Sequence, residues 1–392
     1  MIKSYLQTFH GLSKDVWMLS FVLLINRAGN MVLPFLSVYL HDKIGLSLEQ
    51  VGWIMGAYGL GAFVGSYAGG QLTDRFHYYP IMIFSLITCG IGYICLQFAS
   101  GFYSFAFIIF ATVFFSDLFR PASMTALGSY SKPEDYTRSV SLLRLAINLG
   151  YAIGPALGGL IAYRIGYIPL FWIDGLTCLG AAFLVRLFLQ QKGVKMKEKK
   201  TKNVLKAESP YRDKQYLIFI AMVTLMALVF LQILTTLPIY FKAQFGLNED
   251  MIGLLLAMNA IIIVALEMPV VHKLEAKSSK IRMVQLGTIL FGLAYVVFLI
   301  DSSWVGMAVI SMILLSIGEI FAMPFSNAYC MDKTTDENRG KYMALYSMAY
   351  SLAFIVSPIL GMQIASNFGF PVLWIVSGVI TVLTVIGFRF VK

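Results

Sequence analysis

Long apolar segments, separated by short polar ones, constrain this chain more than any other feature. Each segment supplies about 20 apolar residues, the length that an α-helix needs to cross the hydrocarbon core of a bilayer. Backbone amides find no water in that core, so a helix is the expected conformation. The sequence therefore predicts an all-α membrane protein with twelve transmembrane helices. The twelve segments cover approximately residues 16–40, 49–71, 80–98, 102–130, 139–163, 169–190, 215–242, 248–271, 283–300, 304–330, 342–365 and 369–390.

Composition agrees with a lipid-facing surface. Of the 392 residues, 58% are hydrophobic and 13% are charged, which one water-soluble core could not accommodate. The net charge of +10 could suggest nucleic acid, but nine basic residues lie between Lys192 and Lys214, between two hydrophobic segments. We interpret this run as a solvated cytoplasmic loop, with a lipid or partner site as the alternative, and expect no nucleic-acid partner.

The distribution of basic residues predicts the orientation. With the N-terminus in the cytoplasm, 23 of the 30 basic residues fall in cytoplasmic segments, four within the membrane, and three (Lys43, Arg164 and Lys242) in periplasmic segments. This excess predicts that both termini are cytoplasmic. The first apolar segment is too long for a cleaved signal peptide and should remain in the protein. Short loops suggest a multi-pass protein of a bacterial inner membrane.

Two halves of the sequence repeat each other. A helix end, a short loop and a helix start recur in the same order about 201 positions later, and two prolines of each half share one spacing. We therefore expect a six-helix half at 1–190, a basic linker at 191–214 and a second six-helix half at 215–392. The matched positions are Val38-Tyr39 with Ile239-Tyr240, Gly45-Leu46 with Gly246-Leu247, Glu49–Gly52 with Asp250–Gly253, Pro121 with Pro324, and Pro155 with Pro358.

Six helices, a basic linker and six more helices resemble the plan of the major facilitator superfamily over essentially the whole chain. Gly150, Gly154, Pro155, Gly158 and Gly159 match the G-x-x-x-G-P-x-x-G-G motif associated with drug:proton antiporters of that superfamily. Glycines four apart leave a helix face almost without side chains, so a neighbouring helix can approach closely, and the proline adds a kink. The resemblance favours efflux, although related uptake carriers have similar glycines.

A second resemblance follows the second hydrophobic segment. The stretch from Gly70 through Asp74 and Arg75 is similar to the start of the superfamily's G-x-L-a-D-R-f-G-R-K signature. It departs at His77, where the family has glycine, and at the next two residues, where basic residues are usual. The resemblance implies that Asp74 helps to gate the cytoplasmic side by capping or pairing with a neighbouring helix. The alternative is a solvated turn.

Ionisable residues inside the membrane are costly and are therefore the functional candidates. Glu319 has no cation within one turn of its own helix, and a carboxyl group in low dielectric favours the neutral form that a proton carrier needs. It also resembles the Glu of a G-E-x-x-x-x-P stretch in proton-coupled carriers; pairing with an arginine of the other half is the alternative. Asp117 and Arg120 share a helix face next to Pro121, so they could form a structural pair or part of a substrate site.

Three further polar residues are substrate-binding candidates. Arg27, flanked by two asparagines, could hold an anionic group or pair with Glu319. Arg144 could act in the same way, with Asn148 one turn further on. The other intramembrane ionisable residues are interpreted as structural; they are Asp174, Arg186 and Glu267.

Together these features predict a secondary transporter that works by alternating access, couples to protons through Glu319 and Asp117, and exports amphipathic small molecules. The alternative is a proton-coupled carrier of a small anionic or zwitterionic solute, such as a peptide or metabolite. No phosphate-binding G-x-x-x-x-G-K-S/T motif is present, so an ATP-driven pump is not expected. No metal or catalytic cluster is evident, so we expect no enzyme and no cofactor. We expect a monomer among membrane lipids.

Overall fold

The computed structural model describes residues 11–192, 210–274, 278–300, 304–334 and 338–391, and these form helices and short connections without a strand. Most of the predicted linker, residues 193–209, lies outside the described residues. The chain divides into two compact units. Unit 1 contains the described residues of Met1–Phe35 and Leu60–Lys200, and unit 2 those of Leu36–Gly59 and Thr201–Lys392. The second unit thus includes a segment that precedes the linker.

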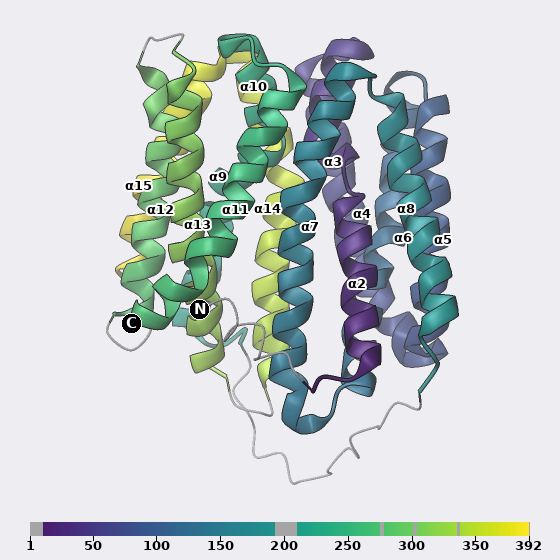
Figure 1. Ribbon diagram of the computed structural model, residues 1–392. Coiled ribbons are helices and arrows are strands. Elements are labelled where there is room, and N and C mark those ends of the chain that lie inside the picture. Colours follow the sequence, from purple (N-terminus) through teal and green to yellow (C-terminus); the bar gives the residue numbers. More distant parts are fainter. Residues whose placement is uncertain (1–10, 193–209, 275–277, 301–303, 335–337, 392) are drawn as a thin grey trace. The chain divides into compact units, whose positions relative to one another are not determined.

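The main helices follow one another with short connections (Figure 1). Helices α3 and α4 each contribute residues to both units. Those before the linker are α2 (Lys14–Ala28), α3 (Val32–Val38), α4 (Leu48–Phe76), α5 (Tyr78–Cys95), α6 (Gly101–Tyr130), α7 (Tyr136–Arg164) and α8 (Ile168–Phe188). Those after it are α9 (Lys214–Phe230), α10 (Thr236–Phe245), α11 (Glu249–Leu274), α12 (Lys280–Val296), α13 (Gly306–Asp332), α14 (Arg339–Phe368) and α15 (Phe370–Phe388).

Eleven stretches of the described residues are helical, long and apolar enough to cross a membrane. They include the first predicted segment, in which α2 and α3 run as one span, and ten of the others. The predicted segment at 49–71 forms α4, whose 29 residues are long enough to cross a bilayer but which is not among the eleven. The sequence of α4 is rich in glycine, which contributes little hydropathy.

The first span is broken near its middle. Helix α2 ends at Ala28 and α3 begins at Val32, so the first amides of α3 lack partners in a preceding turn. The buried Asp174 of α8 accepts hydrogen bonds from the N–H of Met31 at 2.9 Å and of Val32 at 2.9 Å. The sequence predicts only a structural role for Asp174, and its contacts identify it as the cap of α3.

The first span after the linker is broken at a corresponding place. Helix α9 ends at Phe230, and a 3₁₀ turn, Leu231–Leu234, leads into α10. The hydroxyl of Ser357 donates to the carbonyl of Leu228 at 2.9 Å, and the buried Gln232 donates to the carbonyl of Ser357 at 3.1 Å. The partners at this second break are therefore neutral side chains: Ser357 satisfies the carbonyl of Leu228, and Gln232 ties the break to the backbone of α14.

Glycines on α4 allow close helix packing. In unit 1, a Cβ added to Gly65 would lie 2.3 Å from the carbonyl oxygen of Phe114 on α6, and Cβ atoms added to Gly61 and Gly69 would lie 2.6 and 2.8 Å from the same helix. In unit 2, a Cβ on Gly59 would lie 2.7 Å from the carbonyl oxygen of Phe354 on α14. The small residues let backbones approach where lipid offers no hydrophobic drive for association.

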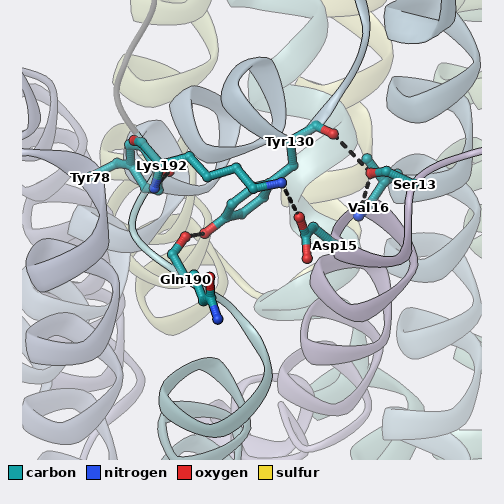
Figure 2. A network of polar contacts seen from close by, with 7 residues as sticks. All are labelled: Ser13, Asp15, Val16, Tyr78, Tyr130, Gln190 and Lys192. Atoms are coloured by element: carbon teal, nitrogen blue, oxygen red, sulfur yellow. Dashed lines mark hydrogen bonds and ion pairs between the residues drawn. The ribbon is translucent and has the colours of Figure 1, made fainter.

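A polar network joins several helix ends of unit 1 (Figure 2). Ser13, the N-cap of α2, donates to the carbonyl of Tyr130 at 2.8 Å, and the Tyr130 hydroxyl donates to the carbonyl of Gln190 at 2.9 Å. Lys192 forms an ion pair with Asp15. These contacts fix the chain leaving α8 against the ends of α2 and α6.

Candidate functional site

The first group of candidate residues surrounds the break between α2 and α3. Arg27 lies in the last turn of α2, and its guanidinium donates to the hydroxyl of Tyr151 on α7 at 3.4 Å. The same guanidinium lies 5.7 Å from the centre of the Tyr151 ring. A hydrogen bond and a cation–π contact thus hold the arginine beside the break.

Asp117 lies near this arginine. Its carboxylate accepts a hydrogen bond from Ser66 of α4 at 3.3 Å, and Arg27 and Arg120 are the cations close enough to act on its charge. The structure therefore brings together three of the predicted residues, Arg27, Asp117 and Arg120. Ser66 was missed in the sequence because a serine in an apolar segment is usually bonded to its own helix.

Two other predicted residues lie on α7. Arg144 is exposed on the protein surface, and Asn148, one turn later, is partly buried. The Arg144 side chain also interacts with another group of the protein, so it is not free. Their role in substrate binding stays a prediction.

The glycine motif of α7 faces the broken helix. A Cβ added to Gly150 would lie 2.5 Å from the Cβ of Arg27, and one added to Gly158 would lie 2.9 Å from the Cβ of Met31. Gly154 faces backbone carbonyls of the break at 3.3 Å, while Pro155 and Gly159 are buried. A side chain at Gly150 would therefore push α7 away from the residue that carries the guanidinium.

In unit 2 a polar stripe runs along one face of α13. It consists of Ser316, Glu319, Met323 and Ser326, which are three or four positions apart and so share a helix face. Asn259 of α11 donates to the hydroxyl of Ser316 at 3.0 Å, and its amide also interacts with the carboxyl of Glu319. Glu319 is partly buried, and no ion pair joins it to another residue that the structure describes.

Tyrosines of α14 complete the stripe. The Tyr346 hydroxyl lies 2.8 Å from that of Ser326, and it donates to the Tyr350 hydroxyl at 3.4 Å. Tyr350 lies 3.0 Å from the Met323 sulfur and close enough to Glu319 for their charges to interact. Glu319 therefore lies among neutral hydrogen-bonding groups and a thioether, and the carboxyl group of Glu267 on α11 is close enough for the two charges to interact.

The predicted gating residues lie at the end of α4. Gly70 has open space around it, and Asp74 and Arg75 are exposed. The Arg75 guanidinium lies 5.2 Å from the ring centre of Phe76, and no ion pair joins Asp74 to another described residue. Their part in gating stays a prediction.

His77, at the departure from the signature, has a backbone φ of 73° and ψ of 150°. L-residues with side chains rarely adopt this conformation, and glycine adopts it readily. The backbone conformation at this position therefore still favours glycine, although this chain has histidine there. In the sequence, only the glycine of the family signature indicates that this position has such a backbone conformation.

Among the described residues no group of three or more His, Cys, Asp or Glu side chains could hold a metal ion. Asn259, Ser316 and Tyr350 were not predicted from the sequence, because ionisable residues are the main signal of function at membrane depth. Polar or phenolic side chains within an apolar segment were the available signal, but their direction depends on packing.

Comparisons with known proteins agree with the fold. The chain is 24% identical over 357 residues to YqjV, an uncharacterized MFS-type transporter of Bacillus subtilis, covering 89% of this chain and 86% of that protein. It is 21% identical over 398 residues to a Na(+), Li(+), K(+)/H(+) antiporter of Planococcus maritimus, covering 92% and 91%.

Solved structures of transporters have the same fold. A POT family transporter in complex with 5-aminolevulinic acid matches with a TM-score of 0.82 at 16% identity, covering 98% of both chains. The nucleoside transporter NupG matches with a TM-score of 0.79 at 13% identity, covering 96% of this chain and 98% of that one.

The family model of the Major Facilitator Superfamily matches residues 16–284 and 235–392, which together cover nearly the whole chain. The family and the structural neighbours are transporters, not enzymes, which agrees with the prediction. The chain is a multi-pass membrane protein and a secondary transporter that belongs to the Major Facilitator Superfamily.

Proposed function

We propose that this transporter exchanges protons for amphipathic small molecules and that Glu319 carries the proton. The observation behind this proposal is the surroundings of Glu319: an amide, hydroxyl groups and a thioether, without an ion pair among the described residues. Neutral partners can bond to either the protonated or the ionised carboxyl, so both states are accessible during a cycle.

The same surroundings favour a particular kind of cargo. Tyrosine rings and the Met323 thioether suit an apolar or cationic body, and an ionised Glu319 would attract a positive charge. In the exchange, Glu319 releases its proton to one compartment as cargo binds. It takes up a proton from the other compartment when cargo leaves, so charge and protons balance over the cycle.

Packing in unit 2 supports alternating access. The Leu36–Gly59 segment packs on α14 through Gly52 and Gly59, and Asp42 forms an ion pair with Lys242 of α10 at 2.9 Å. These contacts between segments before and after the linker must break and re-form if the two six-helix halves rock during transport. Asp117, bonded to Ser66, is a second proton carrier in this scheme.

The excess of basic residues supports an orientation with both termini in the cytoplasm, and the short loops support a location in a bacterial inner membrane. The antiporter relative supports proton exchange, while its cations would be a different cargo for this chain. For this reason an assay should compare lipophilic cations, alkali-metal ions, dipeptides and organic anions.

The test is cargo-dependent proton flux in liposomes that contain a pH-sensitive dye. A lipophilic cation should produce flux with the wild type and none with Glu319→Gln, because glutamine cannot exchange a proton. Cargo-for-cargo exchange should persist in Glu319→Gln, which shows that the variant is folded. Asp250→Asn, a carboxyl change at the start of α11 in the same unit, should retain flux. Unchanged flux in Glu319→Gln would contradict the assignment and direct attention to Asp117.

The alternative cargo is a small anion or zwitterion held by Arg27. Its support is the neutral hydrogen-bond partner Tyr151, at 3.4 Å, which a carboxylate could replace on the guanidinium. Arg120, Arg144 and Asn148 would then complete the site. Uptake of a labelled dipeptide that Arg27→Lys weakens would favour this alternative, because lysine keeps the charge but loses the two-pronged geometry.

A further inference from the structure

A cavity of about 530 Å³ lies in unit 2, away from the polar stripe of α13. It is bounded by the start of α12 and the ends of α13 and α15, which meet at the lower end of the view in Figure 1. The side chains that matter for its chemistry are Lys280, Arg282, Gln285, Tyr329, Asp332 and Arg389.

The cavity has an excess of positive charge. Lys280 forms an ion pair with Asp332 at 2.5 Å, so these two charges offset each other. Arg282 and Arg389 are exposed, and neither forms an ion pair with another described residue. Two guanidinium groups that line the same cavity are therefore available to bind a ligand. The planar guanidinium group matches the geometry of phosphate oxygens.

The outer faces of two bounding helices are apolar. On α12, Leu286, Ile289 and Leu293 are exposed at the spacing of one helix face. On α15, Val382 and Ile386 are exposed four positions apart. Helices α12 and α15 pack against each other, so their exposed apolar side chains form a surface beside the cavity. In a membrane protein such side chains face acyl chains.

From this arrangement we infer that the cavity binds the headgroup of an anionic phospholipid. Arg282 and Arg389 contact the phosphate, and the acyl chains lie along α12 and α15. Basic pockets at helix ends on the cytoplasmic side are suited to anionic lipid, and the charge distribution predicts that this end is cytoplasmic. The site is separate from the proposed proton and cargo residues.

The test measures lipid retained by the purified protein in native mass spectrometry. The protein is titrated in detergent with phosphatidylglycerol, with phosphatidylcholine, and with inorganic phosphate. The test variant is Arg282→Gln/Arg389→Gln. A charge-matched control, Arg186→Gln/Arg212→Gln, changes two exposed arginines that do not line the cavity.

Phosphatidylglycerol should bind the wild type and the control more tightly than phosphatidylcholine does. The test variant should bind it about 30-fold more weakly, which corresponds to ~1 kcal/mol for each arginine. Arg282→Lys/Arg389→Lys should bind phosphatidylglycerol with an affinity between those of the wild type and the test variant, because lysine keeps the charge but loses the two-pronged geometry. This variant separates loss of charge from misfolding.

Three results would overturn the inference. Equal retention of the two lipids would show that headgroup charge is not recognised. Equal weakening in the control variant would show a general effect of net charge. Competition by inorganic phosphate at the affinity of the lipid would identify a site for free phosphate instead.

Discussion

The backbone at His77 leads to an unusual prediction, namely that glycine is more stabilising than alanine at a position flanked by two helices. Helix α4 ends at Phe76 and α5 begins at Tyr78, so His77 alone makes the turn, with φ of 73° and ψ of 150°. Such a conformation costs a residue with a Cβ about 1–3 kcal/mol. Substitution with alanine keeps that cost, whereas glycine removes it.

The magnitude follows from comparing the two variants. Both lose the same ring contacts, since the His77 ring lies 3.1 Å from the carbonyl oxygen of Lys192 and accepts from the N–H of Tyr79 at 3.4 Å. These losses cancel in the comparison. Glycine carries an entropic cost of about 0.5–1 kcal/mol relative to alanine. His77→Gly should therefore be about 1 kcal/mol more stable than His77→Ala, within a range of about 0–2.5 kcal/mol.

The assay is thermal unfolding of the two variants in the same detergent. For units of this size a difference of about 1 kcal/mol corresponds to a Tm higher by about 2–4 °C for the glycine variant. Tyr79, two residues later and inside α5, is the control position: there alanine should be more stable than glycine. If alanine is the more stable residue at position 77 as well, the backbone strain inferred for His77 is not present.

Two further predictions concern helix ends. Asp174→Ala should destabilise the protein by ~2–6 kcal/mol, because two buried backbone N–H groups lose their acceptor, and Asp174→Asn by about half as much. Thermal unfolding beside the exposed-site control Glu134→Ala checks this, and shifts no larger than the control's would refute the capping role. The second prediction is a pH dependence at Lys242, which lies in the last turn of α10, where the charge distribution predicts the periplasmic end of the span. Burial opposes its charge, but hydrogen bonds and charges of Glu249 and Asp42 outweigh burial and raise the pKa of Lys242 above 10.5. A raised lysine pKa stabilises the fold at lower pH and loses that effect as pH rises through it. The Tm difference between wild type and Lys242→Met should thus be constant from about pH 7 to pH 9 and shrink only above about 10.5. A difference that disappears below pH 9 would contradict the ion-pair assignment.

Sequence alone was sufficient for the fold class because lipid permits few structures. Apolar segments of sufficient length must be helices in a bilayer, so each predicted segment corresponds to a helix or a broken helix. The interruptions of the first span and of its counterpart after the linker were not predicted. A break of a few residues leaves the apolar pattern intact, and its partners, such as Asp174, lie far away in the sequence.

The candidate site could be predicted only in part. Charge at membrane depth identified Arg27, Asp117 and Glu319, because ionisable groups are conspicuous among apolar residues. Which residues surround them depends on helix rotation, and every face of these helices carries apolar side chains, so periodicity could not assign it. Asn259 of α11 and Tyr350 of α14 are therefore apparent only in the structure.

The two broken helices also have an evolutionary consequence. If both halves descend from one ancestral six-helix unit, they inherited the same interruption but now stabilise it by different means: an aspartate, Asp174, in the first and the neutral pair Gln232 and Ser357 in the second. Each solution depends on a partner helix within its own half. The halves have thus become non-interchangeable at this point, and a transplanted broken helix would need its partner helix to move with it.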